Sequence, residues 1–343
     1  MRTTMRWLIL ISMVLLMTDK RAALAFVKPD NVRALYLSAD YIHNEQKITE
    51  LEHIFSLTKA NGIVIDFKDS NVISQVHIEK LQKRFKRYGV YTIARIVTFQ
   101  DSYFARKHPE VAIKTAAGDF WHSGRAVWKR YWLDPASQLA QDYNIEVAKR
   151  AIDAGFDEIQ FDYIRFPTDG NMRNIRYPVF GSSSETKKEI MDGFFKKIRN
   201  SLKAYESQII ISIDVFGEVF LRGQESGIGQ SIDGVAEYFD VISPMAYPSH
   251  YMCREFGVQD PTAHPYLVYR ETLQKGLVRL QRHNVMIRPW IQDFTIASIY
   301  GCGPHVSYTQ ERVADQIRAA QDLGIAGFML WNAHNNFTIN VLK

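Results

Sequence analysis

The stretch VAKRAIDAGFDEIQFDYIRFP, residues 147–167, contains one full step of the architecture. Its first part carries apolar residues at the spacing of one helix face and ends at Gly155, because glycine readily takes the left-handed conformation that closes a helix. The short run 158–161 then predicts a strand, and Asp162 follows at its end. A helix, a tight joint, a strand and a polar residue in this order indicate a parallel α/β fold.

The same step recurs along the whole chain. Eight short apolar runs predict strands, at residues 32–37, 63–67, 91–97, 158–161, 209–213, 241–245, 286–290 and 327–331. Runs of this kind are typical of strands buried on both faces of a parallel sheet. Amphipathic stretches lie between them, for example around Ile48 and around Val313. Strand and helix alternating eight times predict a single (β/α)₈ TIM barrel, with a doubly wound open sheet as the less common alternative.

The connections differ in length on the two sides of the predicted sheet. Joints from helix to strand are tight, as at Asn61-Gly62 and Leu323-Gly324. Connections from strand to helix are often long, at residues 98–135, 167–184, 246–265 and 292–307. Long βα loops on the C-terminal face are typical of a barrel whose active site lies there.

The N-terminal segment differs from the rest of the chain. Arg2 and Arg6 precede the apolar run 7–17, and a small-x-small site ends at Ala25. This layout predicts a signal peptide over residues 1–25, cleaved after Ala25, followed by the barrel over 26–343. Three charged residues at 19–21 leave an uncleaved membrane anchor as the alternative. The protein is therefore expected to be exported, to the periplasm or beyond, and to touch a membrane only through this segment.

Composition excludes several classes of protein. The chain is 46% hydrophobic and 23% charged, which is a globular balance. Its net charge of +5 is spread along helix faces without a concentrated basic face, so no nucleic-acid partner is expected. Two cysteines, Cys253 and Cys302, follow the sixth and seventh predicted strands, and they can form a disulfide if their Cα atoms lie within about 7 Å.

Polar and aromatic residues gather where the predicted strands end. They are Asp66, Arg95, Asp162, Tyr163, Arg165, Asp214, Glu218, Tyr247, Trp290, Gln292, Asp293, Trp331 and Asn332. In a barrel these positions converge on one mouth. For any one of them, the alternative is a structural role as a helix cap, a loop hydrogen-bond acceptor or a core aromatic residue.

Two carboxylates on neighbouring strands, Asp162 and Asp214, stand out within this set. Two like charges at one mouth raise the pKa of one group, and glycoside hydrolysis needs such a pair of acid and carboxylate. Glu218 is a competing candidate for the second carboxyl group, because it lies four residues beyond Asp214. Arg165 is expected to offset the charge of Asp162, so that the second carboxyl group stays protonated and acts as the acid.

Aromatic side chains at the same strand ends favour a sugar ligand, because indole and phenol rings combine apolar area with a polar edge. Trp290 and Trp331 are predicted as subsite walls, and Tyr163 and Tyr247 as further contacts. The sequence contains no glycine-rich phosphate loop, Cys-x-x-Cys or His-Glu-x-x-His motif, so neither a cofactor nor a metal is expected.

Several long motifs resemble a bacterial and archaeal family of glycoside-hydrolase-like domains of otherwise unknown function. They are IARIVTFQD at 93–101, WLDP at 132–135, FDYIRFP at 161–167, ISPMAYPSHY at 242–251, RPWIQDF at 288–294 and LWNA at 330–333. The resemblance runs from about residue 32 to 336 and implies a TIM barrel related to carbohydrate-active enzymes. One departure is the segment Tyr300-Gly301-Cys302-Gly303, where the family usually has more glycine and tyrosine.

The leading functional prediction is a glycoside hydrolase acting on an extracellular or cell-envelope polysaccharide. The main alternative is a carbohydrate-binding barrel without catalysis, which would keep the aromatic residues and lack a working carboxylate pair. A third possibility is lyase or deacetylase chemistry on the same substrates, with Tyr247 as a base or a metal at the mouth.

Overall fold

The computed structural model describes residues 31–69, 75–123, 129–225, 227–304 and 306–343. The predicted signal peptide lies outside these residues. None of the described helices is both long and apolar enough to cross a membrane.

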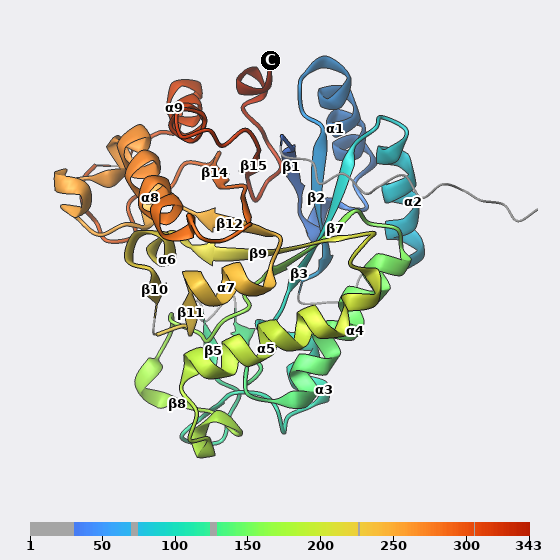
Figure 1. Cartoon of the computed structure of the whole chain (residues 1–343), viewed down its shortest axis with the longest axis vertical. Helices are drawn as coiled ribbons and strands as arrows, with labels where there is room; N and C mark the ends of the chain where they lie inside the picture. The colour runs from blue at the N-terminus through green and yellow to red at the C-terminus, as the bar shows by residue number, and fades with distance from the viewer. Residues whose placement is uncertain (1–30, 70–74, 124–128, 226, 305) are drawn as a thin grey trace, which may run out of the picture.

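All eight predicted strands are present in one parallel sheet (Figure 1). They are β1 (Arg33–Leu37), β2 (Gly62–Lys68), β3 (Tyr91–Val97), β7 (Glu158–Asp162), β9 (Ile210–Phe216), β12 (Val241–Met245), β13 (Met286–Ile287) with β14 (Trp290–Gln292), and β15 (Phe328–Trp331). Their order in the sheet is sequential, and β1 lies between β2 and β15.

The seventh strand is the one that departs from the prediction. A single strand was expected at 286–290, but the chain forms β13 beside β12 and β14 beside β15. Arg288 and Pro289 separate the two parts, since proline has no N–H to donate to a ladder. The backbone still bridges both sides, as the Arg288 amide donates to Ile242 at 3.0 Å and the Pro289 carbonyl accepts from Met329 at 3.0 Å. This stretch therefore closes the sheet into a TIM barrel.

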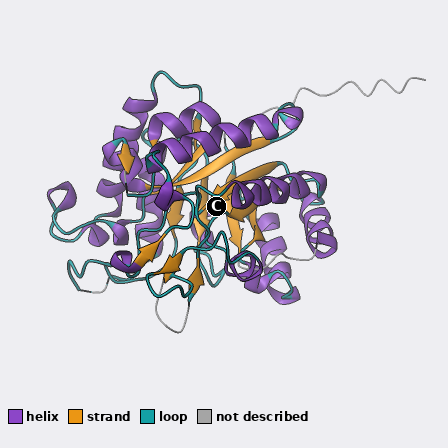
Figure 2. Cartoon of the chain, turned by 90° about the horizontal axis from the view of Figure 1, so that it is seen from below, coloured by secondary structure: helices purple, strands orange, loops and turns teal. Residues whose placement is uncertain are grey.

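Helices surround the barrel, as Figure 2 shows from a second direction. They are α1 (Glu45–Leu57), α2 (Gln75–Lys86), α3 (Ser102–Lys107), α4 (Gln138–Asp153), α5 (Lys187–Ser201), α6 (Gly217–Arg222), α7 (Ile232–Tyr238), α8 (Pro265–Leu280) and α9 (Gln310–Gln321). After β15 the chain enters the short 3₁₀ helix η9 (Ile339–Leu342), whose Leu342 carbonyl accepts from the Lys59 amide at 2.8 Å. The C-terminal segment therefore packs beside the end of α1.

The long strand-to-helix connections carry small elements of their own. In these loops the short strands β4 (Lys114–Thr115) and β8 (Ile175–Arg176) pair, as do β5 (His122–Ser123) and β6 (Arg130–Tyr131). A further short pair, β10 (Gln224–Glu225) with β11 (Gln230–Ser231), connects α6 to α7. The predicted disulfide is confirmed, since Cys253 and Cys302 are bonded with their Cα atoms 5.0 Å apart. It joins the loop after β12 to the loop after β14.

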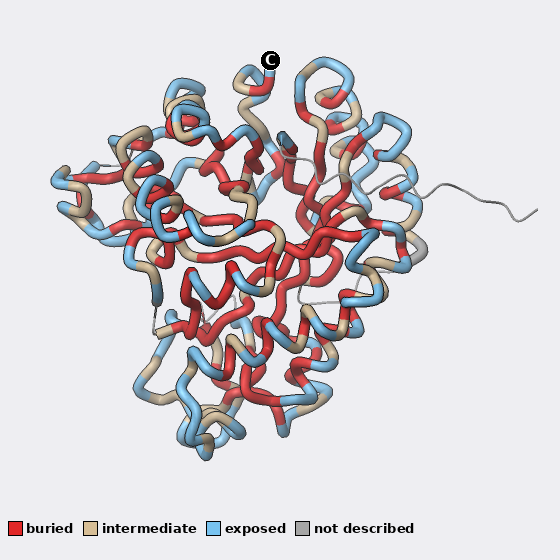
Figure 3. Tube along the Cα trace, in the orientation of Figure 1, coloured by how far each residue is buried: buried red, intermediate tan, exposed pale blue. Residues whose placement is uncertain are grey.

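Burial follows the strands (Figure 3). Side chains that point away from the barrel axis, such as Ile159 and Phe161 of β7, join the large core under the helices. Those that point inward form a second core, with Ala34, Val64 and Ile93 among its members. Gly155 takes φ +87° at the joint before β7, as the helix-ending role requires.

Candidate active site

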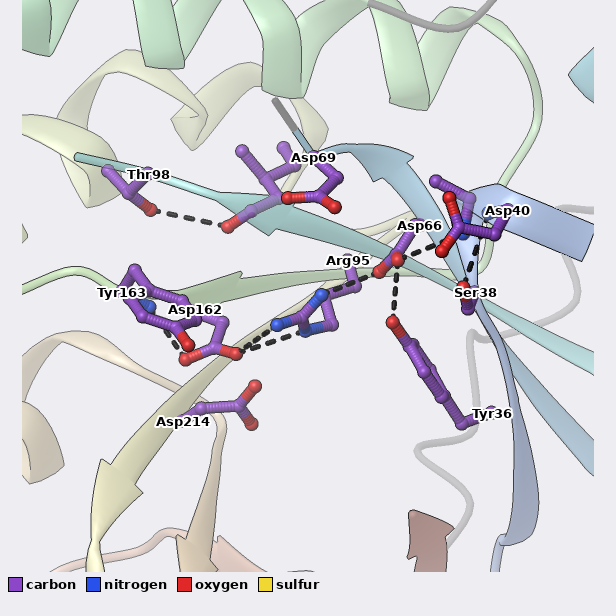
Figure 4. Close-up of polar contacts among 12 residues, drawn as sticks. Tyr36, Ser38, Asp40, Asp66, Asp69, Arg95, Thr98, Asp162, Tyr163 and Asp214 are labelled. Carbon is purple, nitrogen blue, oxygen red and sulfur yellow. Dashed lines mark hydrogen bonds and ion pairs between the residues drawn. The ribbon is translucent and has the colours of Figure 1, made fainter. Parts of the chain in front are cut away.

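The polar centre of the mouth is an arginine held between two aspartates. Arg95 of β3 donates from Nη1 to Asp66 of β2 at 2.6 Å and from Nε to Asp162 of β7 at 3.0 Å (Figure 4). All three side chains are buried. Burial opposes the charged form of Arg95, but the two carboxylates outweigh it and raise the pKa of the guanidinium well above its ordinary value. The convergence of these three predicted site residues is therefore observed.

Asp66 has further partners that the sequence did not reveal. The Tyr36 hydroxyl of β1 donates to its Oδ2 at 2.6 Å, and the Ala39 amide donates to the same atom at 3.1 Å. Burial raises the pKa of Asp66, and the nearby Arg95 offsets part of that shift. Tyr36 could have been found from the sequence, because it lies two residues beyond Ala34 and therefore on the same inward face of the strand.

Asp162 is fixed by its own backbone as well as by Arg95. The next residue, Tyr163, has φ +48°, and its amide donates to Oδ1 of Asp162 at 2.6 Å. A non-glycine residue in this left-handed region carries local strain, which is common at functional sites. Both oxygens of Asp162 are therefore engaged, and its carboxylate is held in one orientation.

Asp214 of β9 lies beside this network and forms no ion pair with any residue that the structure describes (Figure 4). Its Oδ1 accepts from the indole Nε1 of Trp290 at 2.7 Å, while its buried Oδ2 has no hydrogen-bond partner among the described residues. Burial and the neighbouring charge of Asp162 raise the pKa of Asp214 well above its ordinary value of 3.8, and Arg95 only partly offsets them. Asp214 is thus the carboxyl group of the mouth that favours its protonated form most clearly.

Aromatic residues form the other half of the mouth. Trp331 of β15 stacks on Tyr36, with ring centroids 5.9 Å apart and an angle of 17° between the planes. Phe294 meets Trp331 edge to face at 5.0 Å, and Tyr247 meets Phe294 at 5.6 Å. Trp331 and Phe294 are partly exposed, so they can contact a ligand.

Trp290 has a different position from the one predicted. Its side chain is 1% exposed, so it is not a subsite wall but the hydrogen-bond donor that orients Asp214.

Tyr247 does not have the properties that the lyase alternative requires of a base. Burial raises its pKa well above 10, and the charges of Asp214 and Asp162 act in the same direction. A phenol in this state is a poor base at neutral pH.

The structure separates Arg165 and Glu218 from the roles that the sequence suggested. Arg95, rather than Arg165, makes the ion pair with Asp162. Glu218 lies in α6 and pairs with Arg222, one turn further along, at 2.6 Å. Asp214 is therefore the carboxyl group that lies beside the Asp162 network and feels its charge.

Three further predicted residues support loops rather than the mouth. The Gln292 side-chain oxygen accepts from the Ser249 hydroxyl at 3.0 Å. Asp293 accepts from the Thr338 hydroxyl at 2.6 Å, and burial raises its pKa to about 6. The Asn332 side-chain oxygen accepts from the His334 amide at 2.9 Å.

A second buried ion pair lies deeper in the barrel and was not predicted. Glu158, at the start of β7, accepts from Arg288 Nη1 at 2.8 and 2.9 Å and from the Tyr91 hydroxyl at 3.0 Å. It occupies the opposite end of the strand from Asp162. Among the described residues, no group of three or more His, Cys, Asp or Glu side chains is placed to hold a metal ion.

A closed parallel barrel with a carboxylate pair and aromatic residues at the strand ends is the architecture of many glycoside hydrolases. Residues 71–337 match the family described as "Putative glycosyl hydrolase domain", and the chain belongs to that family. No curated protein matches the chain.

Two solved glycosidase structures share the fold, and a third solved structure aligns with part of the chain. An α-galactosidase from Thermus thermophilus, in complex with p-nitrophenyl α-D-galactopyranoside, aligns with a TM-score of 0.54 and 13% identity over 92% of this chain and 61% of its own. A plant class V chitinase mutant from Cycas revoluta, in complex with (GlcNAc)3, aligns with a TM-score of 0.54 and 11% identity over 91% of this chain and 97% of its own. A hypothetical protein from Ruminiclostridium thermocellum is 29% identical over 53% of this chain and 97% of its own, with a TM-score of 0.44.

Proposed function

We propose that the protein is a glycosidase in which Asp214 is the general acid and Asp162 is the partner carboxylate. The observation that carries this proposal is the state of Asp214, which is 1% exposed, has an unpartnered Oδ2 and has a raised pKa. A carboxyl group kept neutral in this way can give its proton to the leaving oxygen of a glycosidic bond.

Asp162 suits the second role. Arg95 and the Tyr163 amide hold both of its oxygens and offset its negative charge. A carboxylate fixed in this way can attack the sugar or activate a water molecule beside it. The two aspartates come from adjacent strands, β7 and β9, so their roles need no rearrangement of the barrel.

The expected substrate is an oligosaccharide or polysaccharide outside the cytoplasm. Partly exposed Trp331 and Phe294 offer ring faces on which sugar C–H groups can pack. The α-galactosidase and the chitinase that share the fold are bound to a galactoside and to a GlcNAc oligomer. The Cys253–Cys302 disulfide suits an oxidising compartment, which supports export.

A hydrolysis assay across a panel of extracellular and cell-envelope glycans tests the proposal. The wild type should release reducing ends from at least one glycan, and Asp214→Asn and Asp162→Asn should each lower the rate about 10²- to 10⁴-fold. Glu218→Gln is the matched control and should leave the rate unchanged, because Glu218 pairs with Arg222 outside the network. Binding of a glycan without cleavage by the wild type would instead support the non-catalytic barrel.

Export has a separate test. Mass spectrometry of the protein purified from its native cells should find an N-terminus at Phe26. A chain that retains Met1 and stays in the cytoplasm would contradict export and leave the catalytic proposal untouched.

A further inference from the structure

Arg165 is an arginine of the mouth that has no carboxylate partner among the described residues. Its guanidinium lies over three aromatic rings, with centroids at 4.4 Å for Phe216, 5.1 Å for Trp132 and 5.2 Å for Tyr163. Its one hydrogen bond to a described residue runs from Nη1 to the Phe166 carbonyl at 3.1 Å. A guanidinium carries five N–H donors, so most of its donor capacity is unused.

The contrast with the other buried arginines of the barrel makes this unusual. Arg95 pairs with two aspartates, and Arg288 pairs with Glu158. Arg165 is 6% exposed and forms no ion pair within the described part of the chain. Burial lowers its pKa, which means that the surroundings do not fully compensate its charge. A buried charge normally has a partner, and here a ligand can provide it.

Its place in the fold directs this charge toward the substrate. Phe216, over which the guanidinium lies, is two residues beyond Asp214 on β9. Residues two apart on a strand point to the same face, about 7 Å apart. Arg165 therefore lies near the C-terminal end of β9, beyond the proposed acid along that strand.

We propose that Arg165 binds an anionic group of the substrate, so that the preferred glycan is an acidic polysaccharide. This inference rests on the proposed function and names the substrate class for the same site. Guanidinium pairs with carboxylate, sulfate and phosphate oxygens through two parallel hydrogen bonds, and the aromatic rings hold its plane in place. An anion bound there also adds negative charge near Asp214, which further favours the protonated acid.

Binding to defined polymers tests the inference without relying on cleavage. Affinity electrophoresis of the full-length protein would compare polygalacturonate with its carboxyl-reduced neutral form, and dextran sulfate with dextran. The wild type should bind one of the two acidic polymers at least tenfold more tightly than its neutral counterpart. Arg165→Gln should weaken that binding about 10- to 100-fold, which is the range for the loss of one hydrogen-bonded charge. Arg165→Lys keeps the charge but loses the planar guanidinium, so its affinity should lie between those of the wild type and Arg165→Gln.

Arg106→Gln is the matched control. Arg106 also lies over an aromatic ring, Tyr131 at 5.1 Å, and donates to a backbone carbonyl, but it is exposed on α3. Its replacement should leave binding unchanged. If the acidic polymer bound only through the overall positive charge of the protein, Arg165→Gln and Arg106→Gln would weaken its binding equally. That result would overturn the proposal.

Two further results would also overturn it. One is equal binding of acidic and neutral polymers by the wild type. The other is a lowered melting temperature in Arg165→Gln with unchanged preference for the acidic polymer, which would make Arg165 a packing residue. If no glycan in the panel is cleaved but the acidic preference depends on Arg165, the catalytic proposal fails and the binding proposal stands.

Discussion

The two ends of the barrel interior contain similar parts in different proportions. At the deep end, Arg288 faces the single carboxylate of Glu158, and the Tyr91 hydroxyl completes the group. At the mouth, Arg95 faces Asp66 and Asp162, the Tyr36 hydroxyl takes the place of Tyr91, and Asp214 lies beside them as a third carboxyl group. An arginine, carboxylates and a tyrosine hydroxyl therefore occur at both levels.

The difference lies in the charge balance. The deep group pairs one cation with one anion and leaves neither oxygen of Glu158 without a donor. At the mouth, Arg95 is already paired with Asp66 and Asp162. Burial and the charge of Asp162 therefore raise the pKa of Asp214, and Arg95 offsets only part of that shift. A balanced buried pair serves the fold, whereas an unbalanced one keeps a proton available for chemistry.

The largest expected effect separates the two ends by activity. Asp214→Asn should lower turnover about 10²- to 10⁴-fold, because the amide keeps the bond from Trp290 but has no acidic proton to give. Its melting temperature should match that of the wild type near pH 3.8 and should be no lower at neutral pH, because the amide, unlike the acid, gains no charge in the unfolded chain. Full turnover in this variant would place the acid elsewhere.

The same variant carries a pH signature. A raised pKa means that the folded protein holds this proton more tightly than the unfolded chain does. Wild-type stability should therefore fall as the pH rises from 3.8, the ordinary value, through the raised pKa of Asp214. Urea unfolding at a series of pH values should show this loss in the wild type and a smaller one in Asp214→Asn.

The deep end should respond in the opposite way. Glu158→Gln leaves Arg288 buried without its counter-charge and should lower the free energy of unfolding by about 3–5 kcal/mol. Turnover per folded molecule should stay intact. Glu146→Gln, at an exposed pair on α4, is the control and should change stability by about 1 kcal/mol or less. Lost turnover at full stability in Glu158→Gln would remove the distinction between the two ends.

Tyr36 at the mouth and Tyr91 at the deep end allow a matched pair of substitutions with smaller expected effects. Tyr36→Phe and Tyr91→Phe each delete a hydroxyl that donates to a buried carboxylate, and each should lower stability by about 1.5–3 kcal/mol. Only Tyr36→Phe should also lower turnover, because Asp66 helps to hold Arg95 against Asp162. Equal turnover in both variants, measured on a cleaved glycan, would count against a shared network at the mouth.

The smallest effect is expected at Glu218. Its replacement by Gln removes a partly exposed pair with Arg222 and should alter the free energy of unfolding by about 1 kcal/mol or less, with turnover unchanged. A large loss of turnover would restore Glu218 as a competitor of Asp214 for the acid.

The sequence was sufficient for the barrel and for the convergence of Asp162 and Asp214 at its mouth, but it left Glu218 as a competitor for the second carboxyl group. Buried strands followed by helices leave few arrangements, and the C-terminal ends of barrel strands always meet at one mouth. Asp162 and Asp214 could therefore be brought together from their positions alone. The split at Pro289 could also have been expected, because proline interrupts a hydrogen-bond ladder.

The partners of the site were harder to predict, because they depend on local backbone turns. Arg165 is three residues from Asp162, yet the left-handed turn at Tyr163 directs its side chain to an aromatic setting. Arg95 on β3 contacts Asp162 on the neighbouring strand β7, and the register between these two strands cannot be obtained from sequence spacing. Asp293 and Asn332 follow strand ends as predicted, but their side chains bind the backbone of the loops that leave the barrel.

The protonation of Asp214 in the folded protein is the most direct test. Difference infrared spectra between wild type and Asp214→Asn, recorded over a series of pH values, isolate this group, because the bands of the other carboxyl groups occur in both proteins and cancel. We expect a protonated carboxyl band in the wild type that persists well above pH 4 and disappears as the pH rises through the raised pKa of Asp214. A carboxylate band at Asp214 that already forms as the pH passes the ordinary value of 3.8 would contradict its role as the acid.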